Sequence, residues 1–221
     1  MHYSPYAVHT PIQPVDSLMY KYQNKPSYKG QKNPEYASMV DNLDRNIGLL
    51  INKLKERDFF DNTFIIFTSD NGGYYGKITM QKPLRAGKGS YYEGGIRIPF
   101  FIIWKDKVTV GKITQTPISH LDIFPTIMEL SGDHSIDKEL DGKSLLPMIT
   151  KGQQMAERSF FWHFPIYLQG YNVLYNENRD SLFRTRPGSL IRKGDWKLHY
   201  YFEDHEIELY NLKEDIGERN N

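Results

Sequence analysis

The chain has 221 residues, 39% of them hydrophobic and 25% charged, and a formal net charge of +1. This length fits one large globular domain or a domain and a half. The near-neutral charge argues against nucleic acid as a partner, because there is no basic excess to neutralise phosphates. No run of 18 apolar residues occurs, so no membrane span is expected, and the absence of cysteine excludes disulfides and thiolate metal sites.

The first third of the chain combines a short apolar step, a polar stretch and a helix. Tyr6–Pro11 is apolar up to His9, where we expect a strand to give way to a loop. Residues 13–32 are polar and contain prolines, which predicts a long loop. Asn33-Pro34-Glu35 is typical of a helix start, and apolar residues at three- and four-residue steps up to Leu54 predict an amphipathic helix.

The central motif is Phe64-Ile-Ile-Phe-Thr-Ser-Asp-Asn-Gly-Gly73. Its apolar run predicts a strand buried on both faces, and a helix followed by a strand is typical of a parallel sheet. Ligands of such sheets bind at the carboxyl ends of the strands, where Asp70 and Asn71 would offer oxygen ligands suited to Ca²⁺ or Mg²⁺. The alternative is a simple turn, because Asn-Gly is a strong hairpin signal.

Residues 83–99 form a glycine-rich segment that carries Arg85, Lys88 and Arg97. Its positive charge and backbone freedom suit the binding of an anion, although the spacing is not that of a Walker loop. A second strand is expected at Pro99–Trp104, with a short partner strand near Val108–Val110.

The remainder of the chain predicts a helix and a small sheet. Residues 119–130 are amphipathic and precede Gly132, which predicts a helix that ends there. After a loop-rich joint near residues 141–152, strands are expected at Ser159–Phe164, Ser189–Lys193, Trp196–Phe202 and Glu206–Tyr210, and Gly-Asp between two of them signals a hairpin. We therefore predict an α/β fold with two parts, an α/β domain over residues 1–145 and an α+β subdomain with an antiparallel sheet over residues 146–221.

Five sequence blocks carry a family resemblance. They are Tyr6-Ala-Val-His-Thr-Pro, Phe67-Thr-Ser-Asp-Asn-Gly-Gly, Leu84-Arg-Ala-Gly-Lys-Gly, Glu93-Gly-Gly-Ile-Arg-Ile-Pro and Leu190-Ile-Arg-Lys-Gly-Asp-Trp-Lys-Leu. The chain resembles the sulfatases of the alkaline-phosphatase superfamily, above all bacterial enzymes that act on sulfated carbohydrates. The resemblance implies part of an alkaline-phosphatase-like mixed or parallel sheet flanked by helices, followed by the smaller subdomain.

The resemblance also implies a role for four residues. Asp70 and Asn71 match the family's ligands of an active-site Ca²⁺ or Mg²⁺, and Lys88 matches a lysine that contacts the sulfate group and its leaving oxygen. His9 matches a histidine near the same oxygen, a candidate acid for the departing alcohol. A divalent cation and a lysine would oppose charge on the sulfuryl oxygens, and an imidazole can donate a proton near neutral pH.

Two further features of the family are missing from the chain. The nucleophile is a formylglycine made from the Cys or Ser of a C/S-x-P/A-x-R motif, and an early pair of aspartates completes the metal site. We therefore expect this chain to be the C-terminal half or so of a sulfatase, inactive without the missing N-terminal half. The parent enzyme would be periplasmic or extracellular, although no signal peptide is seen in this chain, and its substrate would be a sulfated carbohydrate or an aryl sulfate.

Two other functions remain open from the sequence. One is a phosphodiesterase or phosphonate hydrolase of the same superfamily, and the other is a catalytically dead binding or structural module. Selectivity for the sugar is expected in the C-terminal subdomain, where two segments combine aromatic and polar side chains suited to sugar rings and additional sulfates. These are Phe161–Tyr167 and the loop Gln169–Pro187, which includes Asn172, Asn176, Arg179, Arg184 and Arg186.

Overall fold

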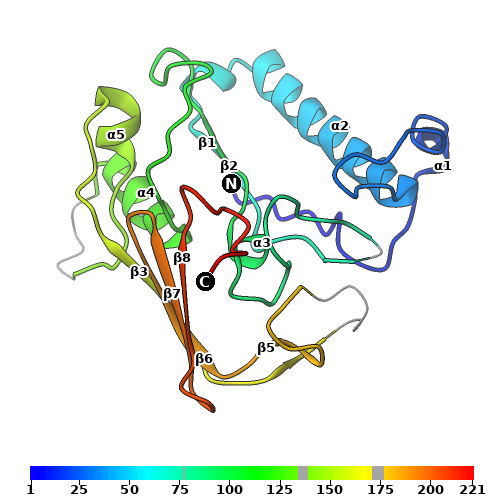
Figure 1. Ribbon diagram of the computed structural model, residues 1–221. Coiled ribbons are helices and arrows are strands. Elements are labelled where there is room, and N and C mark those ends of the chain that lie inside the picture. The colour runs from blue at the N-terminus through cyan, green and yellow to red at the C-terminus, as the bar shows by residue number, and fades with distance from the viewer. Residues whose placement is uncertain (77, 134–138, 171–176) are drawn as a thin grey trace.

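A computed structural model of the chain describes residues 1–76, 78–133, 139–170 and 177–221. It has the predicted α/β fold, with helices on either side of a short strand pair and a separate four-stranded sheet (Figure 1). In chain order the elements are α1 (Asp16–Met19), α2 (Pro34–Glu56), η1 (Phe60–Asn62), β1 (Ile65–Thr68), α3 (Glu93–Ile96), β2 (Phe100–Ile103), η2 (His120–Asp122), α4 (Ile123–Ser131), α5 (Leu146–Lys151), β3 (Ser159–Phe164), β4 (Leu168–Gln169), β5 (Phe183–Thr185), β6 (Gly188–Lys193), β7 (Trp196–Tyr201) and β8 (Ile207–Asn211).

Helix α2 begins where the sequence predicts. The Asn33 side chain accepts a hydrogen bond from the Tyr36 backbone N at 2.9 Å, which satisfies one of the free N–H groups of the first turn. The preceding polar stretch is not all loop, because it contains α1. Lys21 and Tyr22 each donate to Asp41 on α2 at 2.8 Å, so this segment is tied to the helix.

Strands β1 and β2 pair antiparallel, with Ile66 opposite Ile102. The expectation of a parallel arrangement at β1 is not met in this pair, because the chain reverses direction between the two strands. The expectation that β1 is buried on both faces is also wrong. Among the described residues β1 has one partner strand, and Phe67 is 40% exposed. No strand forms at residues 108–110, where the chain runs through a turn instead.

The strands β3, β6, β7 and β8 form the predicted antiparallel sheet, in the spatial order β3-β6-β7-β8. Gly194 adopts a positive φ of 56° in the hairpin between β6 and β7, as the Gly-Asp signal predicts. On β7 the polar side chains Lys197 and His199 are buried, whereas Trp196 faces solvent. The buried face of β7 therefore carries charged and polar side chains.

The packed core lies between this sheet and the glycine-rich segment. Tyr92 and Ala86 cluster with Tyr210 and Leu212, and Tyr91 clusters with residues of β6 and β7. The glycine-rich segment is thereby fixed against the C-terminal sheet.

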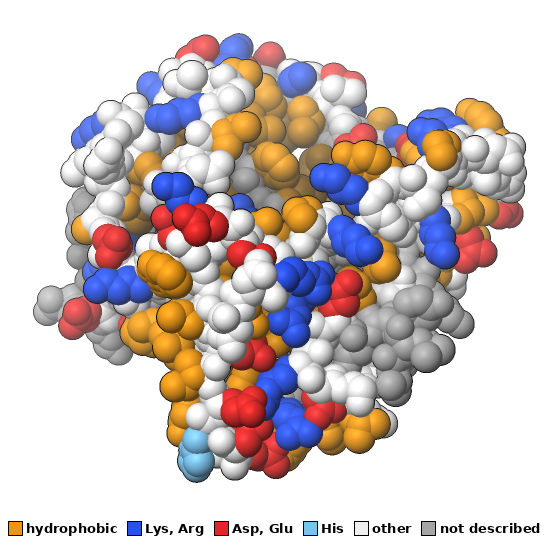
Figure 2. Space-filling view, in the orientation of Figure 1, with side chains coloured by type: hydrophobic (Ala, Val, Ile, Leu, Met, Phe, Trp, Pro, Cys, Tyr) orange, Lys and Arg blue, Asp and Glu red, His pale blue; other side chains and the backbone are white. Residues whose placement is uncertain are grey.

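A large hollow of about 4120 Å³ opens at the surface of the molecule. Figure 2 shows apolar side chains gathered inside it, towards the top of the view. The apolar stripe of α2 lines it together with β1 and β2. No helix within the described ranges combines the length and the apolar character that crossing a membrane requires.

Candidate active site

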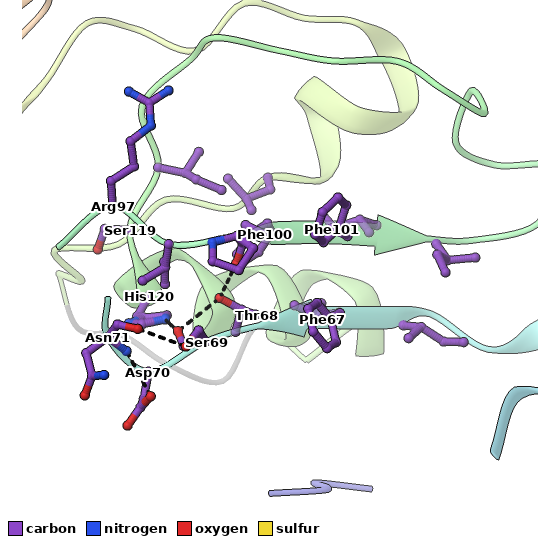
Figure 3. Close-up of a pocket in the computed structure, with 18 of the residues that line it drawn as sticks. Phe67, Thr68, Ser69, Asp70, Asn71, Arg97, Phe100, Phe101, Ser119 and His120 are labelled. Atoms are coloured by element: carbon purple, nitrogen blue, oxygen red, sulfur yellow. Dashed lines mark hydrogen bonds between the residues drawn. The ribbon is translucent and has the colours of Figure 1, made fainter. Parts of the chain in front are cut away.

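Asp70 and Asn71 follow β1 after one residue, Ser69, and project away from the strand pair (Figure 3). Thr68 Oγ1 donates to Pro99 O at 3.1 Å, which joins the end of β1 to the start of β2. Ser69 Oγ donates to Asn71 O at 2.9 Å, and the Asn71 backbone N donates to Asp70 Oδ1 at 3.0 Å. The motif is not a hairpin turn, because the strand that pairs with β1 begins only at Phe100.

Main-chain hydrogen bonds join this loop to the glycine-rich segment. Gly72 N donates to Gly95 O and Lys88 N donates to Gly73 O, both at 2.9 Å. The fit requires glycine, since a Cβ on Gly72 would lie 1.8 Å from Gly94 O. The expectation of backbone freedom in this segment is therefore replaced by close packing of backbone on backbone.

His9 and Lys88 meet although 79 residues separate them, with His9 Nε2 3.3 Å from Lys88 Nζ. His9 Nδ1 lies 2.9 Å from Thr10 O, which as a carbonyl can only accept. Nδ1 therefore carries the proton that is donated to Thr10 O, and Nε2 is the ring atom that faces Lys88 Nζ. The expected strand before His9 is absent, because residues 6–9 form a turn closed by a bond from His9 N to Tyr6 O.

The four residues singled out from the sequence line the same hollow. Asp70 and Asn71 supply hard oxygen donors, a chemistry that fits Ca²⁺ or Mg²⁺. The described residues contain no group of three His, Cys, Asp or Glu side chains arranged to hold a metal ion. The donor set therefore fits such a cation only in part, and the roles of all four residues stay predictions.

Arg85, Lys88 and Arg97 are the positive charges predicted to bind an anion. Lys88 and Arg97 line the hollow, whereas Arg85 does not. Its guanidinium lies 3.8 Å from the Tyr92 ring centroid and donates to Glu218 O at 2.9 Å, so it holds the C-terminal segment. Arg97 lies 3.6 Å from Glu93.

A buried charge cluster behind the site was not predicted from the sequence. Lys197 Nζ lies 3.0 Å from Glu93 Oε1 and 2.8 Å from Glu218 Oε1, and none of the three side chains is more than 1% exposed. Burial raises the pKa of Glu218, but the contacts with His199 and Lys197 outweigh it and leave that pKa below its usual value. Burial lowers the pKa of His199, which lies beside Glu218.

The arginines of the predicted selectivity loop are engaged within the protein. Arg179 pairs with Asp204 and Glu206, and Arg186 pairs with Glu203 and with Asp180. Arg184 Nη1 donates to Lys88 O at 3.3 Å, so the loop reaches the site. Asn172 and Asn176 lie outside the described residues.

Comparison with known proteins identifies the family. A family model described as Sulfatase matches residues 1–133, and one described as N-sulphoglucosamine sulphohydrolase, C-terminal, matches residues 87–221. The α/β fold is also that of a solved putative sulfatase from Bacteroides fragilis, which matches 94% of this chain with a TM-score of 0.70. The chain belongs to the sulfatase family. The two models overlap, so they set no boundary, and the division at residues 145 and 146 stays a prediction.

Three relatives indicate how far the likeness extends. A sulfatase of Formosa agariphila is 35% identical over 99% of this chain and 41% of its own length. Human N-acetylgalactosamine-6-sulfatase is 31% identical over 71% of this chain and 29% of its own. A solved structure, described as the crystal structure of Ps i-CgsB in complex with k-i-k-neocarrahexaose, matches with a TM-score of 0.77 and 32% sequence identity. The match covers 97% of this chain and 44% of the chain in that structure. The chain thus spans less than half the length of each of these relatives.

Proposed function

We propose that this chain is the C-terminal part of a sulfatase that hydrolyses sulfate esters of carbohydrates. The observation that carries the proposal is the convergence of His9 and Lys88 on the hollow that Asp70 and Asn71 also line. Two of the relatives above support a carbohydrate substrate, one by its name as a sulfatase of N-acetylgalactosamine and the other by the neocarrahexaose in its complex. An aryl sulfate is the simpler substrate of the same chemistry.

In this proposal the residues of the chain bind and orient the sulfate group. The Lys88 ammonium opposes negative charge on the sulfuryl oxygens and on the leaving oxygen. The Thr10 carbonyl orients the His9 ring, so that Nε2 is the atom that holds or releases a proton at the leaving alcohol. Asp70 and Asn71 would hold a Ca²⁺ or Mg²⁺, which when bound draws charge from the sulfate oxygens.

The proposal includes a further segment of the enzyme that supplies the rest of the site. Two oxygen donors are few for Ca²⁺, which takes six to eight. The sequence contains no cysteine, and no serine in a C/S-x-P/A-x-R motif, that could become a formylglycine. The apolar lining of the hollow also supports such a segment. Large exposed apolar patches are rare on monomeric proteins and usually mark a surface that another segment or partner covers. By itself the chain would be inactive, and the complete enzyme would act in the periplasm or outside the cell.

Asp70→Ala in the complete enzyme tests the proposal. We expect loss of metal-dependent hydrolysis of sulfated sugars and of an aryl sulfate, because the charged ligand is removed. Asp16→Ala is the matched control, since Asp16 is an exposed carboxylate outside the hollow.

The same assay separates the alternatives. Faster turnover of a phosphonate monoester or a phosphodiester than of any sulfate ester would favour the related hydrolases. A complete enzyme without activity on any of these esters would instead point to a binding module. Either result would overturn the proposal.

A further inference from the structure

His120 lies beside the loop that carries Asp70 and Asn71, as Figure 3 shows. Its Nε2 is 2.9 Å from Ser69 O, the carbonyl directly before Asp70. Because a carbonyl can only accept, Nε2 must donate the proton of this hydrogen bond. Thr68 Oγ1 lies 3.3 Å from the same carbonyl. The Thr68 hydroxyl has a single proton, which it donates to Pro99 O at the shorter distance of 3.1 Å. His120 is therefore the side chain that fixes the peptide group from which Asp70 extends.

The turn that presents His120 is held by a buried carboxylate. Asp122 is 0% exposed and closes a capping box with Ser119, whose backbone N donates to Asp122 Oδ2 at 2.8 Å. Lys143 N donates to Asp122 Oδ1 at 2.8 Å, and Arg158 Nη1 donates to the same oxygen at 2.7 Å. Arg158 Nη2 pairs with the other oxygen. A buried charge is costly unless it is bonded in this way, so the turn is firmly fixed.

The backbone of the turn also packs tightly against its neighbour. A Cβ on Gly142 would lie 1.9 Å from Leu121 O, so the chain can approach the turn here only with glycine. His120 therefore stands on a rigid support that reaches from Arg158, directly before β3, to Ser69 at the end of β1. The His120 side chain is exposed, so its position depends on the fixed backbone of the turn and on the hydrogen bond to Ser69 O.

We infer that His120 is a positioning residue for the metal site, acting through Ser69 on the direction of the Asp70 carboxylate. The inference rests on the proposed function, because it takes Asp70 as a ligand of the divalent cation. Groups that orient metal ligands act in this way elsewhere, and their removal typically costs about 10- to 100-fold in metal affinity or activity. His120 touches neither substrate nor metal in this account.

The test measures Ca²⁺ affinity by calorimetry, and turnover, in the complete enzyme. His120→Ala is expected to weaken Ca²⁺ binding by about tenfold, whereas His120→Gln, which keeps an N–H donor of similar reach, should stay within about threefold of the parent. His120→Phe keeps a flat ring without the donor and should resemble His120→Ala. His205→Ala is the matched control, because His205 is also exposed and makes one polar contact, from Nδ1 to Tyr200 Oη at 2.7 Å.

The possible results separate this inference from the proposed function. If Asp70→Ala binds Ca²⁺ as tightly as the parent enzyme, the proposed function itself fails. If Asp70→Ala loses binding and His120→Ala keeps it, the metal site stands and the inference is overturned. A His120→Gln variant as weak as His120→Ala would also overturn it, because the hydrogen bond would then not be what matters. A loss in His205→Ala equal to that in His120→Ala would show a general effect and count against it too.

Discussion

Replacing Lys197 by Met tests the buried charge cluster most directly. Lys197 lies between two carboxylates from distant parts of the chain, Glu93 in α3 and Glu218 near the C-terminus. Methionine has a similar length and volume, so the variant removes the charge while leaving little cavity. What remains is a pair of buried carboxylates without the cation between them.

The expected loss of stability follows from burial. Breaking a buried ion pair by removing one partner costs about 3–5 kcal/mol, because the other charge stays uncompensated. Glu93 keeps Arg97 and Arg192 at 3.6 and 3.9 Å, and Glu218 Oε2 keeps the hydrogen bond from Glu93 N at 2.6 Å. These contacts limit the damage, so we place the loss within that range rather than above it.

Urea unfolding of the complete enzyme measures this loss. Lys193→Met is the matched control, because Lys193 is exposed on the neighbouring strand β6 and should change stability by less than about 0.5 kcal/mol. The double variant Lys197→Met, Glu218→Gln should recover part of the loss, since it removes one of the two carboxylates. A loss below about 1 kcal/mol for Lys197→Met would refute the reasoning.

Two further predictions concern pH and selectivity. The pKa of His199 is lowered by burial, so as pH falls the unfolded chain takes up this proton before the folded chain does. The contribution of neutral His199 to the free energy of unfolding should therefore be fully present above about pH 6.5 and decline below it. The lowered pKa of Glu218 should add a second decline below about pH 4.3. Urea midpoints between about pH 3 and 8 check both declines. The same slope between about pH 5 and 8 in His199→Gln would contradict the assignment to His199. Exchanging residues 169–187 for the loop of a relative with another sugar preference, with Arg184 retained, should reorder the turnover of sulfated sugars and leave a small aryl sulfate unchanged. Unchanged rates on both kinds of substrate would make the loop purely structural.

Local signals predicted the elements of the fold well. Asn33 and Pro34 mark the start of α2 because a cap and a fixed φ act within one turn, and Gly132 ends α4 in a left-handed conformation for the same local reason. The antiparallel sheet followed from alternating runs and a Gly-Asp turn. Val108–Val110 misled because two valines favour a strand only where a partner strand is available.

The candidate site could be predicted from the sequence where its motifs lie next to each other, and not where distant residues meet. Asp70 and Asn71 stand out after an apolar strand, but nothing local links His120 to Ser69, 51 residues earlier. In β7 the pattern is misleading, because Trp196 faces solvent while Lys197 is buried. A lysine between apolar residues normally indicates the exposed face of a strand. Lys197 is buried here because it pairs with Glu93 and Glu218, which come from elsewhere in the chain.

The main-chain bonds between the Asp70 loop and the glycine-rich segment have a consequence for inherited variation. Gly72 with Gly95, and Gly73 with Lys88, are joined by backbone N–H and C=O groups, which every amino acid except proline carries. Most substitutions therefore leave this frame intact, and only the replacement of a close-packed glycine such as Gly72 would force it apart. A substitution of a side chain that faces the hollow can thus change the chemistry of the site without breaking the main-chain frame that holds the Asp70 loop.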